Sequence, residues 1–317
     1  MNKLPENIVN KTYRFEHEML YSKVMNQLKT YRLNTVFIVS IEFLEHGYYN
    51  FGGIRTPCID LNSINATSYE ILCLINTDYN SRSDIIENFI KNFDSSGVII
   101  KDSRNVIKSF ESDKVSYNIK SFKIPNIFNA IAYNKLRSSK AERSYRYAQK
   151  LLSIGINTPD PIAYFEFKTR LFLKNSYYVS KNIEYNFSIR EVIKDLNFKN
   201  RENILKLFSE FTFKLHENNI NYLDHSPGNT LIKVNENKYK FYLIDLNRME
   251  FKKMSLDDRM KNFNRLTQDS NVIKIFSEQY ASLYKVDNDI IYKKMLFYSN
   301  KFFSNRSKLK KLKKFKF

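Results

Sequence analysis

The chain is poor in the residues from which disulfide frameworks and metal clusters are built. Among its 317 residues are two cysteines, Cys58 and Cys73, four histidines and no tryptophan. Two cysteines cannot form a disulfide framework or a structural zinc site, and a chain with so few is typical of the reducing cytosol. The sequence therefore excludes a disulfide-stabilised secreted domain.

Long hydrophobic runs are also missing. Residues 1–32 are polar and lack the apolar core of a secretory signal. The most apolar short run, Thr35 to Ile41, is far below the roughly 20 residues that a membrane-spanning helix needs. The sequence therefore predicts a cytoplasmic protein, which can still contact the membrane from the inside.

Acidic residues are outnumbered by basic ones. The chain has 33 Asp and Glu against 52 Lys and Arg, a formal net charge of +19. Such a field attracts nucleic acid, anionic membranes or phosphorylated substrates, but it does not specify a fold. Most of the basic residues are spread out and no recognised nucleic-acid module is present. Nucleic-acid binding therefore rests on charge alone, and we do not expect it.

The C-terminal end has a composition of its own. Apolar side chains alternate there with basic ones, and no acidic residue occurs between Lys301 and Phe317. A polybasic segment is attracted to anionic lipid, and its apolar side chains can insert into the interface. We therefore expect an anionic membrane surface as a partner, with a solvated tail and an RNA-binding tail as the alternatives. The basic residues are Lys301, Arg306, Lys308, Lys310, Lys311, Lys313, Lys314 and Lys316.

Residues 1–92 read as a small α/β segment in which we find no chemistry. Helical periodicity and β-branched runs alternate there, and Ser83 can cap the second helix. The expected elements are a helix over Arg14–Arg32, strands over Thr35–Phe43 and Tyr69–Ile75, and a helix over Ser83–Phe93.

From Gly97 the pattern changes to short strands, one helix that stops at Gly155, two further strands and then mostly helices. This order predicts an α+β fold with two lobes. A small antiparallel β-rich N-lobe is expected over about 93–182 and an α-helical C-lobe over about 183–304. A basic tail follows at 305–317. The expected strands are Val98–Lys101, Asn105–Phe110, Val115–Phe122, Ile162–Phe167, Ser176–Val179, Thr230–Val234 and Tyr239–Asp245, and the helices Ser138–Ser153, Ile189–Leu196, Arg201–Asn218, Ser255–Leu266, Asn271–Tyr284 and Asp289–Ser304.

The strongest local signal is the segment from Asp224 to Asn229, with Pro227-Gly228 between them. Phosphoryl transfer needs a carboxylate that orients or deprotonates the attacking hydroxyl, and oxygen ligands for magnesium. An Asp followed five residues later by an Asn supplies both from one loop. The alternative is a surface turn, because every residue type in this segment favours turns.

A second signal is the hydrophobic strand that ends in Asp245. A short hairpin after Asn229 would return the chain so that Asp245 lies beside Asp224, which would gather three oxygen-bearing side chains. Taken alone, an Asp at the end of a strand is more often structural. The spacing between the two motifs is what favours a joint metal and catalytic site.

A third signal is Lys120, a strand lysine with apolar neighbours that can reach nucleotide phosphates. Glu142, on the following helix, is the acidic residue placed to pair with it, as in the strand-lysine and helix-glutamate pair of kinases. The alternative for any single lysine is a solvated charge. His216 is expected to have a structural role, and His225 is expected to be exposed.

These residues, in this order, resemble the lipopolysaccharide kinase family, which includes the Kdo kinases of Gram-negative bacteria. The resemblance covers about Phe93 to Lys308. It rests on Arg104–Lys108, Ile119–Pro125, Arg137–Ala141 with Arg143–Tyr145, Gly155–Tyr164, Asp224–Leu231 and Ile244–Met249.

The resemblance implies a protein-kinase-like fold, ATP and magnesium as cofactors, and a lipid-linked sugar as the acceptor. The acceptor group would be a hydroxyl of a Kdo-type sugar on lipid A, in the lipopolysaccharide inner core, and the enzyme would work at the cytoplasmic face of the inner membrane. Asp224 then matches the catalytic base, Asn229 and Asp245 the magnesium ligands, and Lys120 the phosphate lysine, with Glu142 as its partner.

The sequence departs from the kinase pattern at two triplets. His-Arg-Asp is replaced by Tyr222 to Asp224, which predicts that the usual bracing of the loop is absent. Asp-Phe-Gly is replaced by Asp245 to Asn247, without its glycine. A pseudokinase, or a membrane-associated scaffold of kinase fold, is therefore the alternative to an active kinase, although the intact Lys, Asp, Asn and Asp set opposes it.

Overall fold

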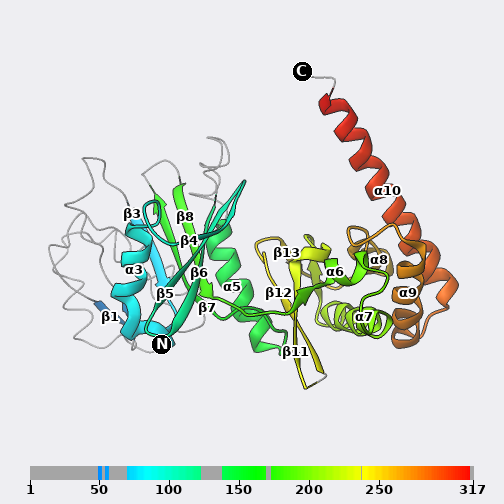
Figure 1. The fold of residues 1–317 in the computed structure, drawn as a ribbon, viewed down its shortest axis with the longest axis horizontal. Coiled ribbons are helices and arrows are strands. Elements are labelled where there is room, and N and C mark those ends of the chain that lie inside the picture. Colours follow the sequence, from blue (N-terminus) through cyan, green and yellow to red (C-terminus); the bar gives the residue numbers. More distant parts are fainter. Residues whose placement is uncertain are drawn as a thin grey trace, which may run out of the picture. The chain divides into compact units, whose positions relative to one another are not determined.

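The computed structural model describes residues 49–51, 54–56, 70–122, 138–168, 173–236 and 238–314 (Figure 1). The chain divides into two compact units, Met1–Arg146 with Asp160–Asn182, and Tyr147–Pro159 with Ile183–Phe317. The first is rich in strands and the second in helices, which confirms the predicted α+β class. The helix predicted over 14–32 and the strand predicted over 35–43 lie outside the described residues.

The first unit is built on a six-stranded antiparallel sheet with the strand order β3-β7-β8-β6-β5-β4. Consecutive strands β5 and β6 join through Asp113 and Lys114, both at positive φ, as a two-residue hairpin turn requires. The strands are β3 (Glu70–Ile75), β4 (Val98–Asp102), β5 (Val106–Ser112), β6 (Val115–Phe122), β7 (Pro161–Lys168) and β8 (Leu173–Lys181), and a separate hairpin pairs β1 (Tyr49–Phe51) with β2 (Ile54–Thr56).

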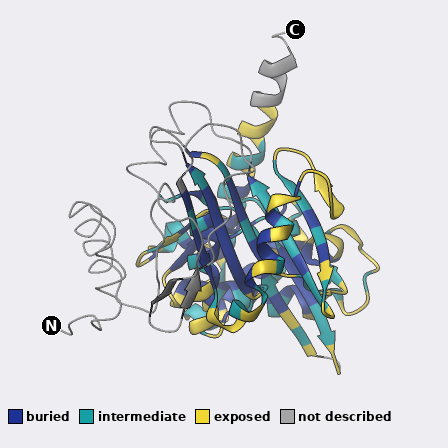
Figure 2. Ribbon diagram, turned by 90° about the vertical axis from the view of Figure 1, so that its left-hand side faces the viewer, coloured by how far each residue is buried: buried dark blue, intermediate teal, exposed yellow. Residues whose placement is uncertain are grey.

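Alternation along the strands gives this sheet two buried faces, seen as dark blue strands in Figure 2. On one face, Tyr117 and Ile119 of β6 pack in a cluster with Ile86 and Ile90 of α3 (Ser83–Lys91). On the other face, Phe122 of β6 packs with the first turns of α5 (Lys140–Ser153). A 3-10 turn, η2 (Thr77–Arg82), leads into α3.

Strand β3 and helix α3 belong to this sheet and its core. The register pairs Glu70 with Lys168 and Ile75 with Ala163, so β3 forms one edge of the sheet. The sequence placed both elements in a separate segment that ended at residue 92. For residues 70–92 that separation does not hold, because their backbone hydrogen bonds and their apolar side chains are shared with the strands that follow.

The second unit is mostly helical. An aromatic core holds it together, in which Phe208 of α7 packs against Phe276 of α9, and Phe263 against Tyr280. Its helices are α6 (Ile189–Lys194), α7 (Arg201–Glu217), α8 (Leu256–Asn262), α9 (Ser270–Tyr284) and α10 (Asn288–Lys314), with η3 (Pro227–Asn229) as a 3-10 turn, and its strands are β9 (Phe187–Ser188), β10 (Ile220–Tyr222), β11 (Thr230–Asn235), β12 (Lys238–Leu243) and β13 (Met249–Phe251).

Helix α10 continues ten residues beyond the end that the sequence predicted at Ser304. Ser299 is buried and donates its hydroxyl to the carbonyl of Thr267, so this part of the helix packs on the unit. Every residue from Ser304 to Lys308 is exposed, and the helix projects away from its neighbours (Figure 1). No helix in the described part of the chain combines the length and hydrophobicity that spanning a membrane requires.

Candidate active site

The loop that carries Asp224 is held by a short strand pair. Strand β10 leads into it and pairs with β13, and the amide of Leu223 donates to the carbonyl of Arg248 at 3.0 Å. Behind Asp224 the chain turns through η3, with Pro227 at its start. A proline fits there because the first amide of a helical turn needs no partner. The backbone on both sides of Asp224 is therefore fixed.

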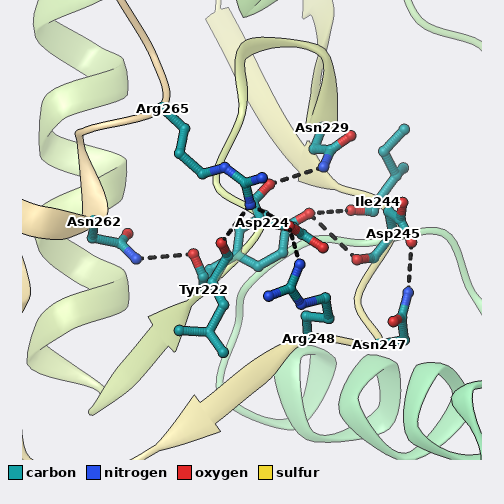
Figure 3. A network of polar contacts seen from close by, with 10 residues as sticks. Tyr222, Asp224, Asn229, Ile244, Asp245, Asn247, Arg248, Asn262 and Arg265 are labelled. Carbon is teal, nitrogen blue, oxygen red and sulfur yellow. Dashed lines mark hydrogen bonds and ion pairs between the residues drawn. The ribbon is translucent and has the colours of Figure 1, made fainter. Parts of the chain in front are cut away.

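The hairpin of β11 and β12 brings Asp245 beside this loop, as the sequence predicted. Thr230 pairs with Leu243, so the next residues outward, Asn229 and Ile244, meet beyond the ladder. The amide of Ile244 donates to the carbonyl of Asn229 at 3.0 Å. Figure 3 shows Asp224, Asn229 and Asp245 gathered at this point.

Tyr222 connects the Asp224 loop to the strand that ends beside Asp245. Its hydroxyl donates to the carbonyl of Ile244 at 2.6 Å and lies 3.5 Å from that of Asp245 (Figure 3). The ring is fully buried. The sequence predicted that the loop would lack its usual bracing, because a tyrosine replaces the expected histidine. That prediction is wrong, since the tyrosine itself braces the loop against the strand that ends in Asp245.

Asp245 is in the left-handed backbone region, at φ 60°. Asp and Asn tolerate this conformation better than other residues with a side chain. Asn247 donates its amide Nδ2 to Asp245 Oδ1 at 2.7 Å, so the residue that stands in place of the expected glycine orients the carboxylate. Strain of this kind collects at functional sites, where the surrounding structure must hold it.

The side chains of Asn229 and Asp245 offer oxygen atoms, the type of ligand that magnesium prefers. Asn229 donates Nδ2 to the carbonyl of Asp224 at 2.8 Å, which leaves its Oδ1 as the atom that it offers to a ligand. The described residues contain no group of three or more His, Cys, Asp or Glu that could hold a metal. Magnesium commonly takes one or two protein oxygens and completes its shell with phosphate oxygens and water. Two protein ligands therefore suit it.

Two arginines hold Asp224, and neither role was predicted from the sequence. Arg248 donates Nη1 to Asp224 Oδ1 at 3.1 Å, and Arg265 donates Nη1 to the same oxygen and to the carbonyl of Leu223 (Figure 3). Arg248 lies within the Ile244–Met249 motif and could have been suspected. Arg265 follows α8 and is separated from Asp224 by 41 positions, and no local pattern signals it.

The segment after α5 supports the strand that ends in Asp245. Gly155 closes α5 at φ 70°, the conformation in which glycine caps a helix. Thr158 then donates its hydroxyl to the carbonyl of Leu243 at 2.8 Å, while the amide of Leu243 donates to the carbonyl of Asn157 at 3.0 Å. The first half of the Gly155–Tyr164 motif therefore holds the end of β12 in place.

The family model described as "Lipopolysaccharide kinase (Kdo/WaaP) family" matches residues 106–286. The chain belongs to the lipopolysaccharide kinase family. It is therefore a kinase that acts on the lipopolysaccharide core.

One solved structure supports the fold of this lipopolysaccharide kinase, and two others have a lower similarity. "WaaP in complex with acyl carrier protein" is similar at TM-score 0.51 and 14% identity, over 70% of this chain and 92% of that chain. The Rio2 kinase of Chaetomium thermophilum is similar at TM-score 0.40 and 12% identity, over 70% of this chain and 68% of that chain. A microcompartment-associated aminopropanol kinase is similar at TM-score 0.42 and 8% identity, over 68% of this chain and 86% of that chain. No curated protein matches the chain by sequence.

Lys120 and Glu142 lie in the first unit of the lipopolysaccharide kinase, on one side of its sheet. Lys120 and Phe122 are two positions apart in β6 and so point to the same face of the sheet, the face that α5 covers. The ammonium of Lys120 lies 5.1 Å from the centroid of the Phe122 ring. Glu142 of α5 forms an ion pair with Arg146 at 2.8 Å. A role for Lys120 and Glu142 at a nucleotide stays a prediction, as does the ion pair between them.

Two histidines form a buried network behind the Asp224 loop. Asn262 Oδ1 accepts from His225 Nδ1 at 2.9 Å and from His216 Nε2 at 3.2 Å, and its Nδ2 donates to the carbonyl of Tyr222 at 2.9 Å. His216 therefore has the expected structural role. The expectation that His225 is exposed is wrong, because the residue is 1% exposed and its ring packs against Phe208.

This network predicts a loss of stability in mild acid. Burial lowers the pKa of His216 to about 3 and that of His225 to about 4. Both rings stay neutral in the folded state, whereas the unfolded chain binds a proton at each ring as the pH falls through about 6.5. The free energy of unfolding should therefore fall by about 1.4 kcal/mol per histidine per pH unit between pH 6.5 and about 4.

The measurement is the urea unfolding midpoint of the wild type and of His225→Gln at pH 7.5, 6.5 and 5.5. The variant removes one titrating group, so its midpoint should fall less between pH 6.5 and 5.5 than that of the wild type. An identical pH dependence in the two proteins would contradict the assignment of a neutral, buried His225.

Proposed function

We propose that the chain transfers the γ-phosphoryl group of ATP to a hydroxyl of a Kdo-type sugar of the lipopolysaccharide inner core, linked to lipid A. Asp224 takes the proton of the hydroxyl as its oxygen attacks the γ-phosphorus, and the bond from that phosphorus to the bridging oxygen of ADP breaks. The observation that supports the proposal is the pair of hydrogen bonds at Ile244, which join the Asp224 loop to the strand that ends beside Asp245.

Each proposed site residue has a separate task. Asn229 and Asp245 would hold magnesium, which when bound neutralises charge on the transferred phosphoryl group. Lys120 would contact nucleotide phosphates as a point charge, with Glu142 as its partner. The bracing by Tyr222 and by Asn247 supports an active kinase over a pseudokinase, because both altered triplets keep a working hydrogen bond.

Incubation of the protein with labelled ATP and lipopolysaccharide precursors, followed by mass spectrometry of the lipid, tests this function. Transfer of label to the sugar in the presence of magnesium is the expected result. Thermal-shift measurements with ATP, with and without magnesium, separate an active kinase from a scaffold. A protein that neither binds ATP with magnesium nor phosphorylates any precursor would refute the proposal.

We also propose that α10 holds the enzyme at an anionic membrane surface, where a lipid-linked acceptor resides. The support is the exposed end of the helix from Ser304 to Lys308 together with the basic and apolar composition of the residues up to Phe317. Each basic residue near such a surface contributes on the order of 1 kcal/mol. An enzyme confined to the plane of its substrate meets it more often.

Removal of residues 305–317 should abolish most of the binding to anionic vesicles. The cut falls after the part of α10 that packs on the unit, so folding should be retained. The measurement is co-sedimentation of full-length and truncated protein with anionic and neutral vesicles at rising salt. Salt should weaken the binding of the full-length protein, and neutral vesicles should retain neither form. Equal sedimentation of the two forms would show that α10 is no anchor.

A further inference from the structure

Asp224 accepts hydrogen bonds from two guanidinium groups at the same oxygen, Oδ1. One charge-assisted hydrogen bond and a fixed backbone suffice to orient a carboxylate. The contacts of both guanidinium groups are at Oδ1, so Oδ2 is the oxygen that we assign to the proton of the acceptor hydroxyl. The surroundings of the two arginines differ, and the difference indicates that they have different tasks.

The side chain of Arg265 is fixed by several contacts. Besides Asp224, its Nη1 reaches the carbonyl of Leu223 at 2.8 Å, and its guanidinium carbon lies 5.4 Å from the centroid of the Phe302 ring on α10. Its side chain is 32% exposed. A guanidinium that is held by a carboxylate, a carbonyl and an aromatic ring at once has little freedom to turn toward another molecule. Arg265 therefore fits the role of holding Asp224 in place.

Arg248 is anchored by its backbone and open at its side chain. Its carbonyl accepts from the amide of Leu223, so its Cα keeps a fixed place beside the Asp224 loop. Its side chain is 55% exposed, and within the described residues the contact recorded for its guanidinium is Asp224 Oδ1. The planar fork has five N–H donors that match a carboxylate or phosphate group in pairs. Because more than half of the side chain is exposed, the donors that Asp224 does not use are accessible to another molecule.

We propose that Arg248 is a specificity-determining residue that binds an oxyanion on the acceptor, next to the hydroxyl that is phosphorylated, and that Arg265 is a positioning residue for Asp224. The proposal rests on the proposed function and identifies one feature of its acceptor. A carboxylate base repels an acidic sugar, since like charges at close range in a partly buried site cost free energy. A cation 3.1 Å from that base offsets the repulsion.

The test compares Arg248→Ala with the matched variant Arg265→Ala on acceptors that differ in one group. The acceptors are a lipid-linked acidic sugar with its carboxylate free or methylated, and the same lipid with or without its phosphates. Loss of Arg248 should raise the KM for an anionic acceptor about 10- to 100-fold, the size expected for charge-assisted hydrogen bonds, with kcat less affected. Loss of Arg265 should lower kcat equally on all acceptors. The KM for ATP should change in neither variant.

The outcomes separate the inference from the function. The group whose removal abolishes the effect of Arg248→Ala is the oxyanion that Arg248 binds. An equal loss on every acceptor, or a wild-type KM in Arg248→Ala, would overturn the inference while leaving the function intact. If the wild type phosphorylates none of the acceptors, the function fails. Titration of the free acidic sugar into wild type and Arg248→Ala then still decides the role of Arg248, because binding requires no turnover.

Discussion

Asp224→Asn is expected to retain nucleotide binding and to lose most of the turnover, by about 10²- to 10⁴-fold, the usual contribution of a general base. The asparagine oxygen can still accept from Arg265 and Arg248, so the loop should keep its geometry. What the amide cannot do is take the proton of the acceptor hydroxyl. The loss should therefore appear in kcat at saturating acceptor.

The measurement is single-turnover transfer from ATP, together with the affinity for ATP and the unfolding midpoint of each protein. Asp257→Asn is a matched control, because Asp257 Oδ1 also accepts two hydrogen bonds, from Lys294 at 2.9 Å and Tyr298 at 2.8 Å, on the surface of the same unit. The control should keep its rate. A rate near that of the wild type in Asp224→Asn would rule out Asp224 as the base.

Local sequence patterns predicted most elements of the fold because they depend on neighbouring residues. Short runs of strand-forming residues identified β6 and β12, and the stop at Gly155 identified the end of α5. The pairing of β3 with β7 joins residues about 90 positions apart, so no local period could reveal it. Strands β10 and β13 were missed for another reason. Three residues are too few to show an alternation.

The end of α10 was missed because composition and propensity conflict there. The run of lysines after Ser304 reads as a tail, yet Lys, Leu and Arg all have high helix propensity. Once the packed half of α10 is formed, extension adds one hydrogen bond per residue without a new nucleation cost. The helix therefore continues through Lys314.

The part of the candidate site that could be predicted consists of residues that are chemically suited to it and close together in the sequence. Asp224, Asn229 and Asp245 fall on one loop and the hairpin after it, so spacing alone brought them together. Asn262 is the last residue of α8 and Arg265 follows that helix, about 40 positions after the loop. Both hold the loop through hydrogen bonds to its carbonyl groups, which carry no sequence signal. Such support can be seen only when the tertiary fold is known.

Substitution of Asp245 should weaken the binding of the magnesium–nucleotide complex itself, unlike substitution of Asp224. A charged oxygen ligand of a hard cation would be lost. The effect should exceed the 10- to 100-fold that the loss of an outer-shell partner typically costs. Asn229→Ala removes a neutral ligand and should have a milder effect. The measurement is ATP affinity across a series of magnesium concentrations.

The left-handed backbone at Asp245 makes the choice of variant decisive. Asp245→Ala removes the charge and also places a residue at φ 60° that tolerates it poorly, which costs about 1–2 kcal/mol of stability. Asp245→Asn removes only the charge, because asparagine accepts this conformation. Both variants should lose the magnesium dependence of ATP binding, whereas only the alanine should lower the unfolding midpoint. If Asp245→Asn binds the magnesium–nucleotide complex normally, Asp245 is not a metal ligand, and the defect of the alanine variant reports backbone strain alone.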